Sequence, residues 1–234
     1  MEKVSTRIEV ARCAAKTLQH PFLLANQVGA NDDLLFDGRS LIAWPDGRVV
    51  MAPAWQEGVL LIDIDDYSSA EWLGEGSITH LEPGADASNS EDDLLQAVVS
   101  GLSGYCAKVG LKKIVLGLSG GIDSAVAACV ASAAVGPENV TGIAMPSKHS
   151  SDHSLADAKA TAAALGIEFL TIGIEDLHEN TTELLSDLLA SGDKVAGENI
   201  QARLRGLIVM AHANANHAMA VSYTHLTLPT IYSV

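Results

Sequence analysis

The pattern of hydrophobic and polar positions changes character along the 234-residue chain. In its first part, apolar residues recur at helical spacing over residues 6–18, which predicts a helix with Ile8, Ala11, Ala15 and Leu18 on one face. Short apolar runs follow and predict strands at 22–25, 41–44, 48–51 and 59–64. Asp46-Gly47 separates two of these runs, which indicates a β-hairpin.

The second part of the chain alternates short apolar runs with longer helical stretches. The predicted strands lie at 114–118, 140–145, 167–172 and 218–222, and the predicted helices at 124–135, 154–165, 176–189 and 198–214. Strands that alternate with helices in this way predict right-handed βαβ units around a parallel sheet. We therefore expect an α/β fold with a doubly wound parallel sheet.

Two segments interrupt these patterns. Residues 67–93 are rich in Ser, Glu, Asp and Gly and predict a linker, so that residues 1–66 and 94–222 would form separate domains. Residues 223–234 read YTHLTLPTIYSV and show no helical period. We expect a non-native tail there, with an edge strand as the alternative.

Composition narrows the class of protein. Hydrophobic residues make up 48% and charged residues 18%, which suits a packed core. A net charge of −15 argues against a nucleic-acid partner, but a nucleotide substrate is compatible because backbone N–H groups and a metal ion can hold phosphates. Three widely spaced cysteines, and no apolar leader or span of about 20 residues, predict a cytoplasmic protein without a membrane partner.

The sharpest motif is GLSGGIDS, formed by Gly117-Leu118-Ser119-Gly120-Gly121-Ile122-Asp123-Ser124. It lies where a predicted strand ends and a helix begins, the place where open α/β sheets bind ligands. Glycines let the backbone turn tightly and direct N–H groups at an anion, and serine hydroxyls add donors. An acid that faces an anion needs a cation between them, which indicates Mg²⁺ chelated by Asp123 and phosphate oxygens.

This loop differs from the two commonest phosphate-binding loops. It lacks the Walker A lysine and the G-x-G-x-x-G spacing of dinucleotide-binding folds. A Gly-rich turn before a helix with a serine N-cap is the alternative that binds no ligand. The motif resembles the pyrophosphate loop of ATP pyrophosphatases, which cleave ATP between the α- and β-phosphates. The resemblance implies that residues 117–124, together with Met145, bind ATP.

Two later stretches resemble the NAD synthetases within that superfamily. Met145-Pro146-Ser147 is similar to a strand-to-helix segment of these enzymes, and Glu198-Asn199-Ile200-Gln201-Ala202-Arg203 is similar to their ENxQAR stretch. The resemblance implies that Asn199 contacts deamido-NAD, with Glu198 and Arg203 nearby. The start of an amphipathic helix with solvated arginines is the alternative.

A stretch in the first part resembles a different enzyme class. Asn26-Gln27-Val28-Gly29, followed by Phe36-Asp37-Gly38, is similar to the NQVGG…FDG segment of nitrilase-type amidases. An amidase segment that precedes a pyrophosphatase loop is the domain order of glutamine-dependent NAD synthetases. The implied fold is the C-terminal part of an α/β nitrilase-like sandwich, followed by a sheet like that of the adenine nucleotide α-hydrolases.

The amidase site of that family uses a Glu, a Lys and a nucleophilic Cys, all N-terminal to the matched segment. We therefore place no amidase nucleophile in this chain, and we interpret Cys13 as a small buried residue. Lys3 matches the Lys-x-x-x-Arg stretch of the family and, by resemblance, touches bound glutamine. We expect a fragment that lacks most of the amidase domain and also the TGNKSE-type loop that follows the last strand in the family.

The resemblance implies ATP-dependent amidation of deamido-NAD through an acyl-adenylate, with ammonia derived from glutamine, in a homo-oligomer. Two alternatives stay open. One is another ATP pyrophosphatase, such as a GMP synthetase-like ligase or a tRNA-modifying enzyme. The other is a truncated module that binds Mg-ATP without turning it over.

Overall fold

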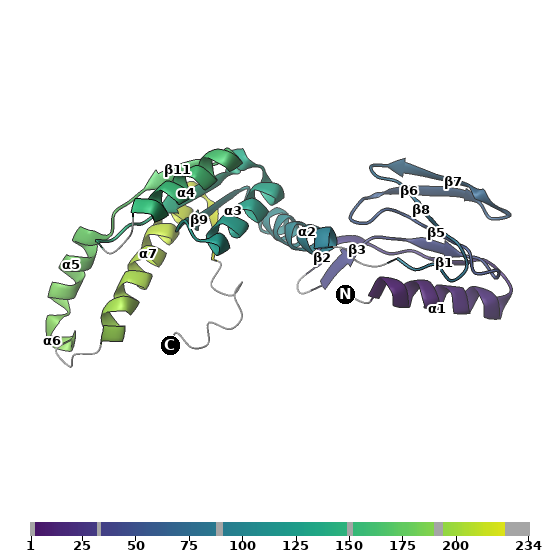
Figure 1. The fold of residues 1–234 in the computed structure, drawn as a ribbon, viewed down its shortest axis with the longest axis horizontal. Helices are drawn as coiled ribbons and strands as arrows, with labels where there is room; N and C mark the ends of the chain where they lie inside the picture. The colour runs from purple at the N-terminus through teal and green to yellow at the C-terminus, as the bar shows by residue number, and fades with distance from the viewer. Residues whose placement is uncertain (1–2, 32–33, 88–90, 149–151, 190–193, 223–234) are drawn as a thin grey trace. The chain divides into compact units, whose positions relative to one another are not determined.

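The structure is a computed structural model that describes residues 3–31, 34–87, 91–148, 152–189 and 194–222 (Figure 1). The chain divides into two compact units, Met1–Tyr105 (unit 1) and Cys106–Val234 (unit 2). The predicted tail at 223–234 lies outside the described residues.

Unit 1 is built on an antiparallel four-stranded sheet with the order β1-β4-β5-β8. Its elements are α1 (Lys3–Leu18), β1 (Phe22–Leu24), β2 (Val28–Asn31), β3 (Leu34–Asp37), β4 (Leu41–Ala43), β5 (Val49–Met51), β6 (Gly58–Asp63), β7 (Asp66–Gly74), β8 (Thr79–Leu81) and α2 (Glu91–Val109), which continues into unit 2. The predicted hairpin is confirmed, because β4 and β5 pair around a turn in which Gly47 has a φ of 93°.

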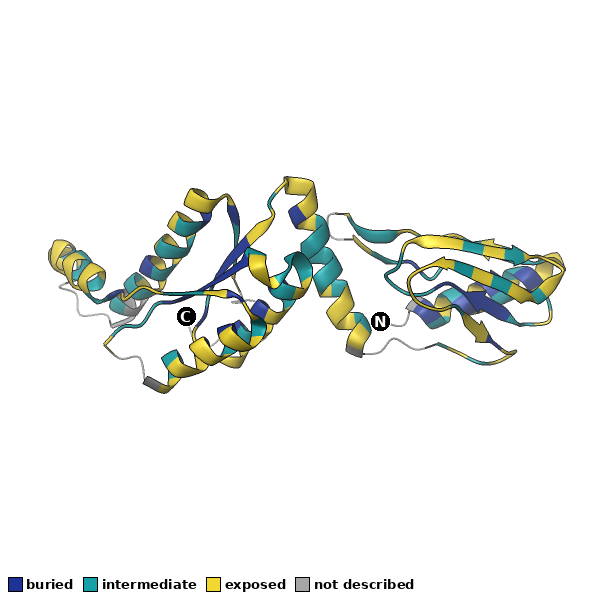
Figure 2. Ribbon diagram, turned by 90° about the horizontal axis from the view of Figure 1, so that it is seen from above, coloured by how far each residue is buried: buried dark blue, intermediate teal, exposed yellow. Residues whose placement is uncertain are grey.

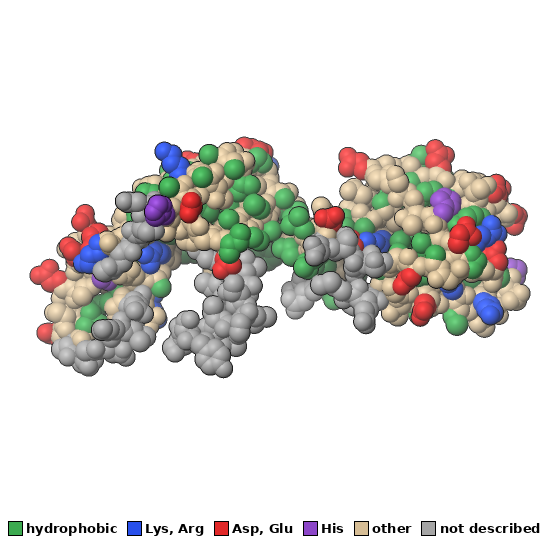
Figure 3. Space-filling model, in the orientation of Figure 1, with side chains coloured by type: hydrophobic (Ala, Val, Ile, Leu, Met, Phe, Trp, Pro, Cys, Tyr) green, Lys and Arg blue, Asp and Glu red, His purple; other side chains and the backbone are tan. Residues whose placement is uncertain are grey.

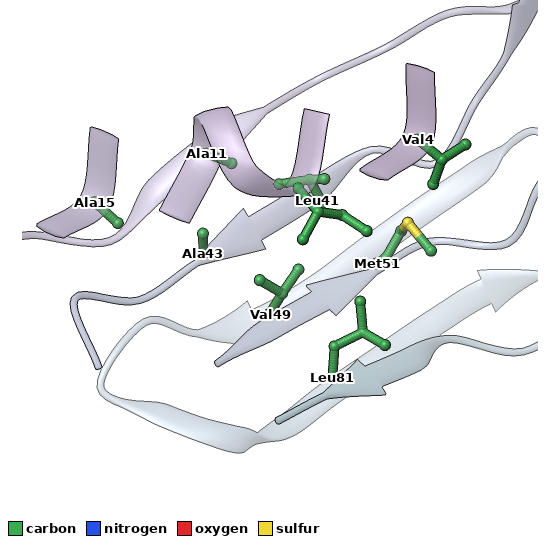
Figure 4. Packing of buried hydrophobic residues seen from close by; sticks show 9 residues of the cluster. Val4, Ala11, Ala15, Leu41, Ala43, Val49, Met51 and Leu81 are labelled. Carbon is green, nitrogen blue, oxygen red and sulfur yellow. The ribbon is translucent and has the colours of Figure 1, made fainter. Parts of the chain in front are cut away.

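Helix α1 covers one face of this sheet (Figure 4). The core between them consists of Val4, Ile8, Ala11 and Ala15 from the helix and Leu41, Ala43, Val49, Met51 and Leu81 from the strands. The predicted helical face is therefore confirmed for Ile8, Ala11 and Ala15, whose side chains are fully buried.

Two residues of α1 are more exposed than the sequence indicated. Leu18 is 58% exposed, since it is the last residue of α1 and lies outside the core cluster of the unit. Cys13 is exposed rather than buried. Side chains on a helix share a face when they lie three or four residues apart, and Cys13 does not have this spacing to Ile8, Ala11 or Ala15.

The opposite face of the sheet packs against the β6–β7 hairpin, where Leu60, Ile62, Tyr67 and Ala70 meet Ile42, Trp44 and Val50. The linker predicted at 67–93 is therefore wrong for the strand residues: β7 belongs to this hairpin, and β8 pairs with β5. The composition is misleading here because Ser68, Ser69 and Glu71 are polar, exposed residues that nevertheless belong to the strand β7.

A network of ion pairs ties α1, β3 and α2 together inside unit 1. The Asp37 carboxylate accepts hydrogen bonds from Arg7 Nη2 at 2.5 Å and from Arg39 Nη1 at 3.0 Å. Arg39 Nη2 donates to Asp93 at 2.7 Å, and Trp55 Nε1 donates to the same aspartate oxygen at 3.3 Å. The charged side chains are only 11–22% exposed. Loss of one partner would therefore leave another charge poorly solvated.

Asp37→Ala is expected to lower the free energy of unfolding of unit 1 by about 3 kcal/mol, the cost of breaking a mostly buried ion pair. All three tryptophans, Trp44, Trp55 and Trp72, lie in this unit, so the midpoint of urea unfolding followed by tryptophan fluorescence reports on it.

The matched control is Asp46→Ala, because Asp46 pairs with Arg48 at the surface, where the two side chains are 48% and 39% exposed. We expect the control to cost about 1 kcal/mol or less. Equal losses in the two variants would contradict a stabilising role for the network.

Unit 2 confirms the predicted parallel sheet. Its strands pair in the order β11-β10-β9-β12, and every pairing is parallel. Its elements are β9 (Lys113–Gly117), α3 (Ile122–Val135), a 3₁₀ turn (Pro137–Asn139), β10 (Val140–Ala144), α4 (Asp152–Leu165), β11 (Glu168–Thr171), α5 (Glu175–Leu184), α6 (Ser186–Leu189), α7 (Lys194–Asn216) and β12 (Ala218–Val221).

Helices cover both faces of this sheet, as a doubly wound fold requires. Val115 and Ile143 pack with Ala213 of α7, whereas α3 and α4 pack against each other and against β9, β10 and β11. Successive side chains of a strand point to opposite faces, so Ile114 and Leu116 face away from α7 and are also buried. Figure 2 shows these strands as the buried centre of unit 2.

The surface fits the acidic composition. Acidic side chains are scattered over the visible face of the molecule rather than gathered in one patch (Figure 3). None of the helices formed by the described residues combines the length and the apolarity that a membrane crossing needs.

Candidate nucleotide-binding site

The topology of unit 2 places the GLSGGIDS loop at a reversal of strand order. From β9 the chain moves to β10 and then β11, and it returns through α7 to β12 on the other side of β9. Open α/β sheets bind ligands at the carboxyl ends of the strands where the order reverses. The Leu118 N–H donates to Ile143 O at 2.9 Å, which extends β9 by one residue before the loop turns away.

Two serines hold the loop in shape. Ser119 Oγ and Ser124 Oγ lie 3.1 Å apart, and Ser124 Oγ donates to Gly121 O at 2.8 Å. Ser124 Oγ also accepts from the Ser119 N–H at 3.2 Å, while Ser119 Oγ accepts from the Gly121 N–H at 3.3 Å. Ser124 is fully buried and Ser119 is exposed. Ser124 thus holds the loop from its buried side, and Ser119 remains accessible to a ligand.

Gly120 is required by both its conformation and its surroundings. Its φ is +82°, in the left-handed region that side chains with a Cβ rarely adopt. A Cβ built on Gly120 would lie 2.2 Å from the Ser154 carbonyl oxygen of α4. The loop therefore approaches the first turn of α4 as closely as a residue without a side chain permits.

The start of α3 offers unsatisfied donors. Gly121 is the N-cap, and no side chain caps the helix. The serine N-cap that was the alternative explanation of the motif is therefore not present. The first N–H groups of a helix lack intrahelical acceptors, and the helix dipole places partial positive charge there. Such an end is suited to binding a phosphate group.

Asp123 lies in the first turn of α3 and is partly buried. It forms no hydrogen bond or ion pair with the other described residues. No group of three or more His, Cys, Asp or Glu side chains gathers into a metal site within the described part of the chain. A single carboxylate fits Mg²⁺, which keeps several waters and is completed by the phosphates of a nucleotide.

The segment after β10 forms the neighbouring wall of the site. A Cβ on Gly117 would meet Met145 Cε at 3.2 Å, so the Met145 side chain lies against the start of the loop. Arg205 Nε of α7 donates to Met145 O at 3.2 Å. The Lys148 N–H donates to Glu175 Oε2 at 2.8 Å, and this bond and the Lys148 ammonium lower the pKa of Glu175.

The residues predicted to contact deamido-NAD lie on α7. Asn199 and Arg203 are exposed, and Arg203 Nη1 donates to Asn199 O at 3.1 Å. Glu198 belongs to the same helix and Lys3 to α1, but their side chains lie outside the described part of the chain. No hydrogen bond joins Asn199 or Arg203 to the loop among the described residues. Their roles therefore stay predictions.

Sequence reasoning missed Arg205 and Glu175, which connect α7 and α5 to the segment after β10. Arg205 is the second arginine of Ala202-Arg203-Leu204-Arg205, and this repetition was the only available signal. Glu175 gave none, because its partner Lys148 lies 27 residues earlier in the chain.

Unit 1 has a cleft of about 840 Å³. Polar residues of its lining include Arg7, Asn26, Asp37, Arg39 and Asp93, and apolar ones include Val4, Leu34, Phe36 and Leu94. The segment that resembles nitrilase-type amidases therefore contributes Asn26, Phe36 and Asp37 to this cleft.

Two known protein families match different parts of this chain. The NAD synthase family matches residues 94–227, and the carbon-nitrogen hydrolase family matches residues 8–72. The chain belongs to the NAD synthase family. Its first part is similar to carbon-nitrogen hydrolases, as the amidase resemblance predicted.

Glutamine-dependent NAD(+) synthetases are among the most similar curated relatives. The enzyme of Synechocystis sp. is 39% identical over 219 residues, which are 93% of this chain and 37% of that protein. The enzyme of Rhodobacter capsulatus is 39% identical over 222 residues, which are 94% of this chain and 39% of that protein. The chain thus spans less than two-fifths of the length of these relatives.

Solved structures agree with this assignment. The glutamine-dependent NAD+ synthetase of Acinetobacter baumannii, in complex with ADP, is 28% identical with a TM-score of 0.84, covering 99% of this chain and 43% of that one. The NMN synthetase of Francisella tularensis is 32% identical with a TM-score of 0.52, covering 58% of this chain and 55% of that one. The first match spans both units, and the predicted fold class is therefore confirmed.

Proposed function

We propose that this chain is part of an enzyme that converts deamido-NAD to NAD, using ATP and ammonia released from glutamine. One observation carries the proposal. In a member of the NAD synthase family, the start of α3, which has no side-chain cap, and Asp123, which has no partner among the described residues, lie at the strand-order reversal. We assign residues 94–222 to the synthetase domain and the residues before them to the amidase domain.

The chemistry has two steps. A carboxylate oxygen of deamido-NAD attacks the α-phosphorus of ATP, the bond to the bridging oxygen breaks, and pyrophosphate leaves with the electron pair. Ammonia nitrogen then attacks the acyl carbon, the amide bond forms, AMP leaves, and a proton is released. The protein contributes positioning and charge stabilisation in both steps rather than a covalent intermediate.

The loop residues have defined tasks in the first step. The first N–H groups of α3 and the Ser119 hydroxyl bind the charge that develops on the leaving pyrophosphate. Ser124 keeps the loop in place through its buried hydroxyl. Met145 lies against Gly117 and lines the wall beside the nucleotide. Asp123 would hold Mg²⁺, which neutralises phosphate charge when it is bound.

In this proposal the amidase domain, of which unit 1 is a part, supplies the ammonia. Lys3 would contact glutamine, and the amidase nucleophile is not assigned to any residue of this chain. By family resemblance we also propose a cytoplasmic enzyme that assembles as a homo-oligomer.

The test is to incubate the protein with Mg-ATP, ammonium and one acceptor, either deamido-NAD or xanthosine monophosphate, and to measure AMP, pyrophosphate and the amidated product. We expect AMP and NAD to form with deamido-NAD only. Product from xanthosine monophosphate would instead indicate a GMP synthetase-like ligase. Binding of Mg-ATP without AMP formation would indicate a non-catalytic module. This alternative is relevant because the chain spans only 37% of the length of a curated relative.

A further inference from the structure

Two reactants of the proposed reaction, ATP and deamido-NAD, are anions, whereas the chain carries a net charge of −15. Positively charged side chains near the site are therefore candidates for binding these anions. Three described ones come from its walls, namely Lys148 after β10 and Arg203 and Arg205 on α7. Lys148 is already paired, since its Nζ lies 3.2 Å from Glu175 and 3.8 Å from Glu179. Arg203 is exposed and bonds to a carbonyl of its own helix.

Arg205 differs from the other two. It is partly buried, and only its Nε donates to a described residue, to Met145 O at 3.2 Å. A guanidinium has five N–H donors, so the four donors on Nη1 and Nη2 have no acceptor among the described residues. No ion pair with a described carboxylate compensates the charge. A partly buried cation without a counterion is unfavourable, and an anion bound beside it removes that cost.

The position of Arg205 indicates where such an anion would bind. Met145 follows β10 and lies against Gly117, the first residue of the loop. The bond from Nε fixes the guanidinium plane next to this wall, and the two terminal nitrogens of a fixed guanidinium match the two oxygens of a carboxylate or phosphate. An anion bound by these two nitrogens would therefore lie beside the segment after β10, at the carboxyl edge of the sheet.

We propose that Arg205 is a substrate-binding residue whose terminal nitrogens bind an anionic group of the deamido dinucleotide, either its pyridine carboxylate or its diphosphate. This inference rests on the proposed function. It adds a contact that the ENxQAR resemblance did not include, and it assigns Arg205 a role apart from the exposed Arg203 on the same helix.

The experiment measures ligand binding to the 234-residue chain by calorimetry in the presence of Mg²⁺. Wild type, Arg205→Gln and Arg205→Lys are each titrated with deamido-NAD, NAD and ATP. The control is Lys112→Gln, which removes the same charge just before β9, at the opposite edge of the sheet. Far-UV circular dichroism and a thermal melt confirm that each variant is folded.

We expect Arg205→Gln to weaken deamido-NAD binding by about tenfold to a hundredfold, the usual effect of losing a charge-assisted contact. Arg205→Lys should recover part of the affinity, and Lys112→Gln should change nothing. NAD carries a carboxamide instead of the carboxylate. A loss confined to deamido-NAD therefore identifies the carboxylate as the partner, and an equal loss for NAD identifies the diphosphate.

Three results would overturn the proposal: wild-type affinity of Arg205→Gln for both dinucleotides, an equal loss in Lys112→Gln, or an equal loss for ATP. The last would mean that Arg205 acts only by holding Met145. Failure of the wild-type chain to bind any of the ligands would count against the proposed function itself, and the inference would fall with it.

Discussion

In the Gly120→Ala variant, binding of Mg-ATP is expected to weaken by about 10²-fold, the size of effect that follows when a binding group is displaced by about 1 Å. The added Cβ would lie 2.2 Å from the Ser154 carbonyl oxygen and 3.0 Å from the Ser154 Cα, which are backbone atoms that cannot rotate away. The loop or the start of α4 must therefore shift, and the N–H groups at the start of α3 would no longer converge on the phosphates.

Gly166→Ala provides the control for this variant. Gly166 also has a positive φ, +71°, but a Cβ there meets no atom within 4 Å. This substitution carries the backbone strain alone, about 1–2 kcal/mol. We expect Gly166→Ala to lower the melting temperature while it binds Mg-ATP normally. If Gly120→Ala bound Mg-ATP as well as Gly166→Ala does, the close approach to Ser154 would have no part in forming the site.

Asp123→Asn is expected to reduce AMP formation in the intact enzyme by about 10²–10³-fold, the usual loss when one preorganised electrostatic group is removed from an active site. The amide has nearly the shape of the carboxylate but is a poor ligand for Mg²⁺, and it adds N–H donors. Because Asp123 makes no hydrogen bond or ion pair with other described residues, the substitution should leave the fold intact.

The assay follows AMP release at increasing Mg²⁺ concentration, since a weakened metal site should shift the Mg²⁺ dependence upward before the maximum rate falls. Asp157→Asn is the matched control, an exposed aspartate on α4. Near-normal turnover by Asp123→Asn would rule out the metal-binding role, and equal losses in both variants would point to net charge instead.

The parts of the fold that sequence could predict are those in which local pattern and tertiary role coincide. β9, the loop and α3 follow one another directly in the chain. Val115 and Leu116 of β9 are buried on opposite faces of the sheet, so the sequence of this strand is a continuous apolar run. The bounds of most predicted helices and strands in unit 2 agree with the structure to within a few residues, apart from the predicted helix at 176–189, which is split into α5 and α6.

The parts that could not be predicted depend on distant partners. β8 is three residues long and is a strand only because β5 pairs with it. α2 was not predicted at all. Its Gly101 and Gly104 let β3 and β2 approach it closely, and these contacts join segments that lie far apart in the chain. Within the site, the bond from Arg205 to Met145 spans 60 residues, so no local pattern indicates it.

The pairing of β12 with β9 has a consequence for how the protein is made. Lys113 is the partner of Ala218, which lies 105 positions later in the chain. At a synthesis rate of about 5–20 residues per second, that side of β9 waits roughly 5–20 seconds for its neighbour. Until then β9 is an open edge that can pair with another chain. The strand-order reversal at the loop also forms only at this late step. A nascent chain is therefore expected to bind ATP only after its exposed β9 edge has been covered by β12.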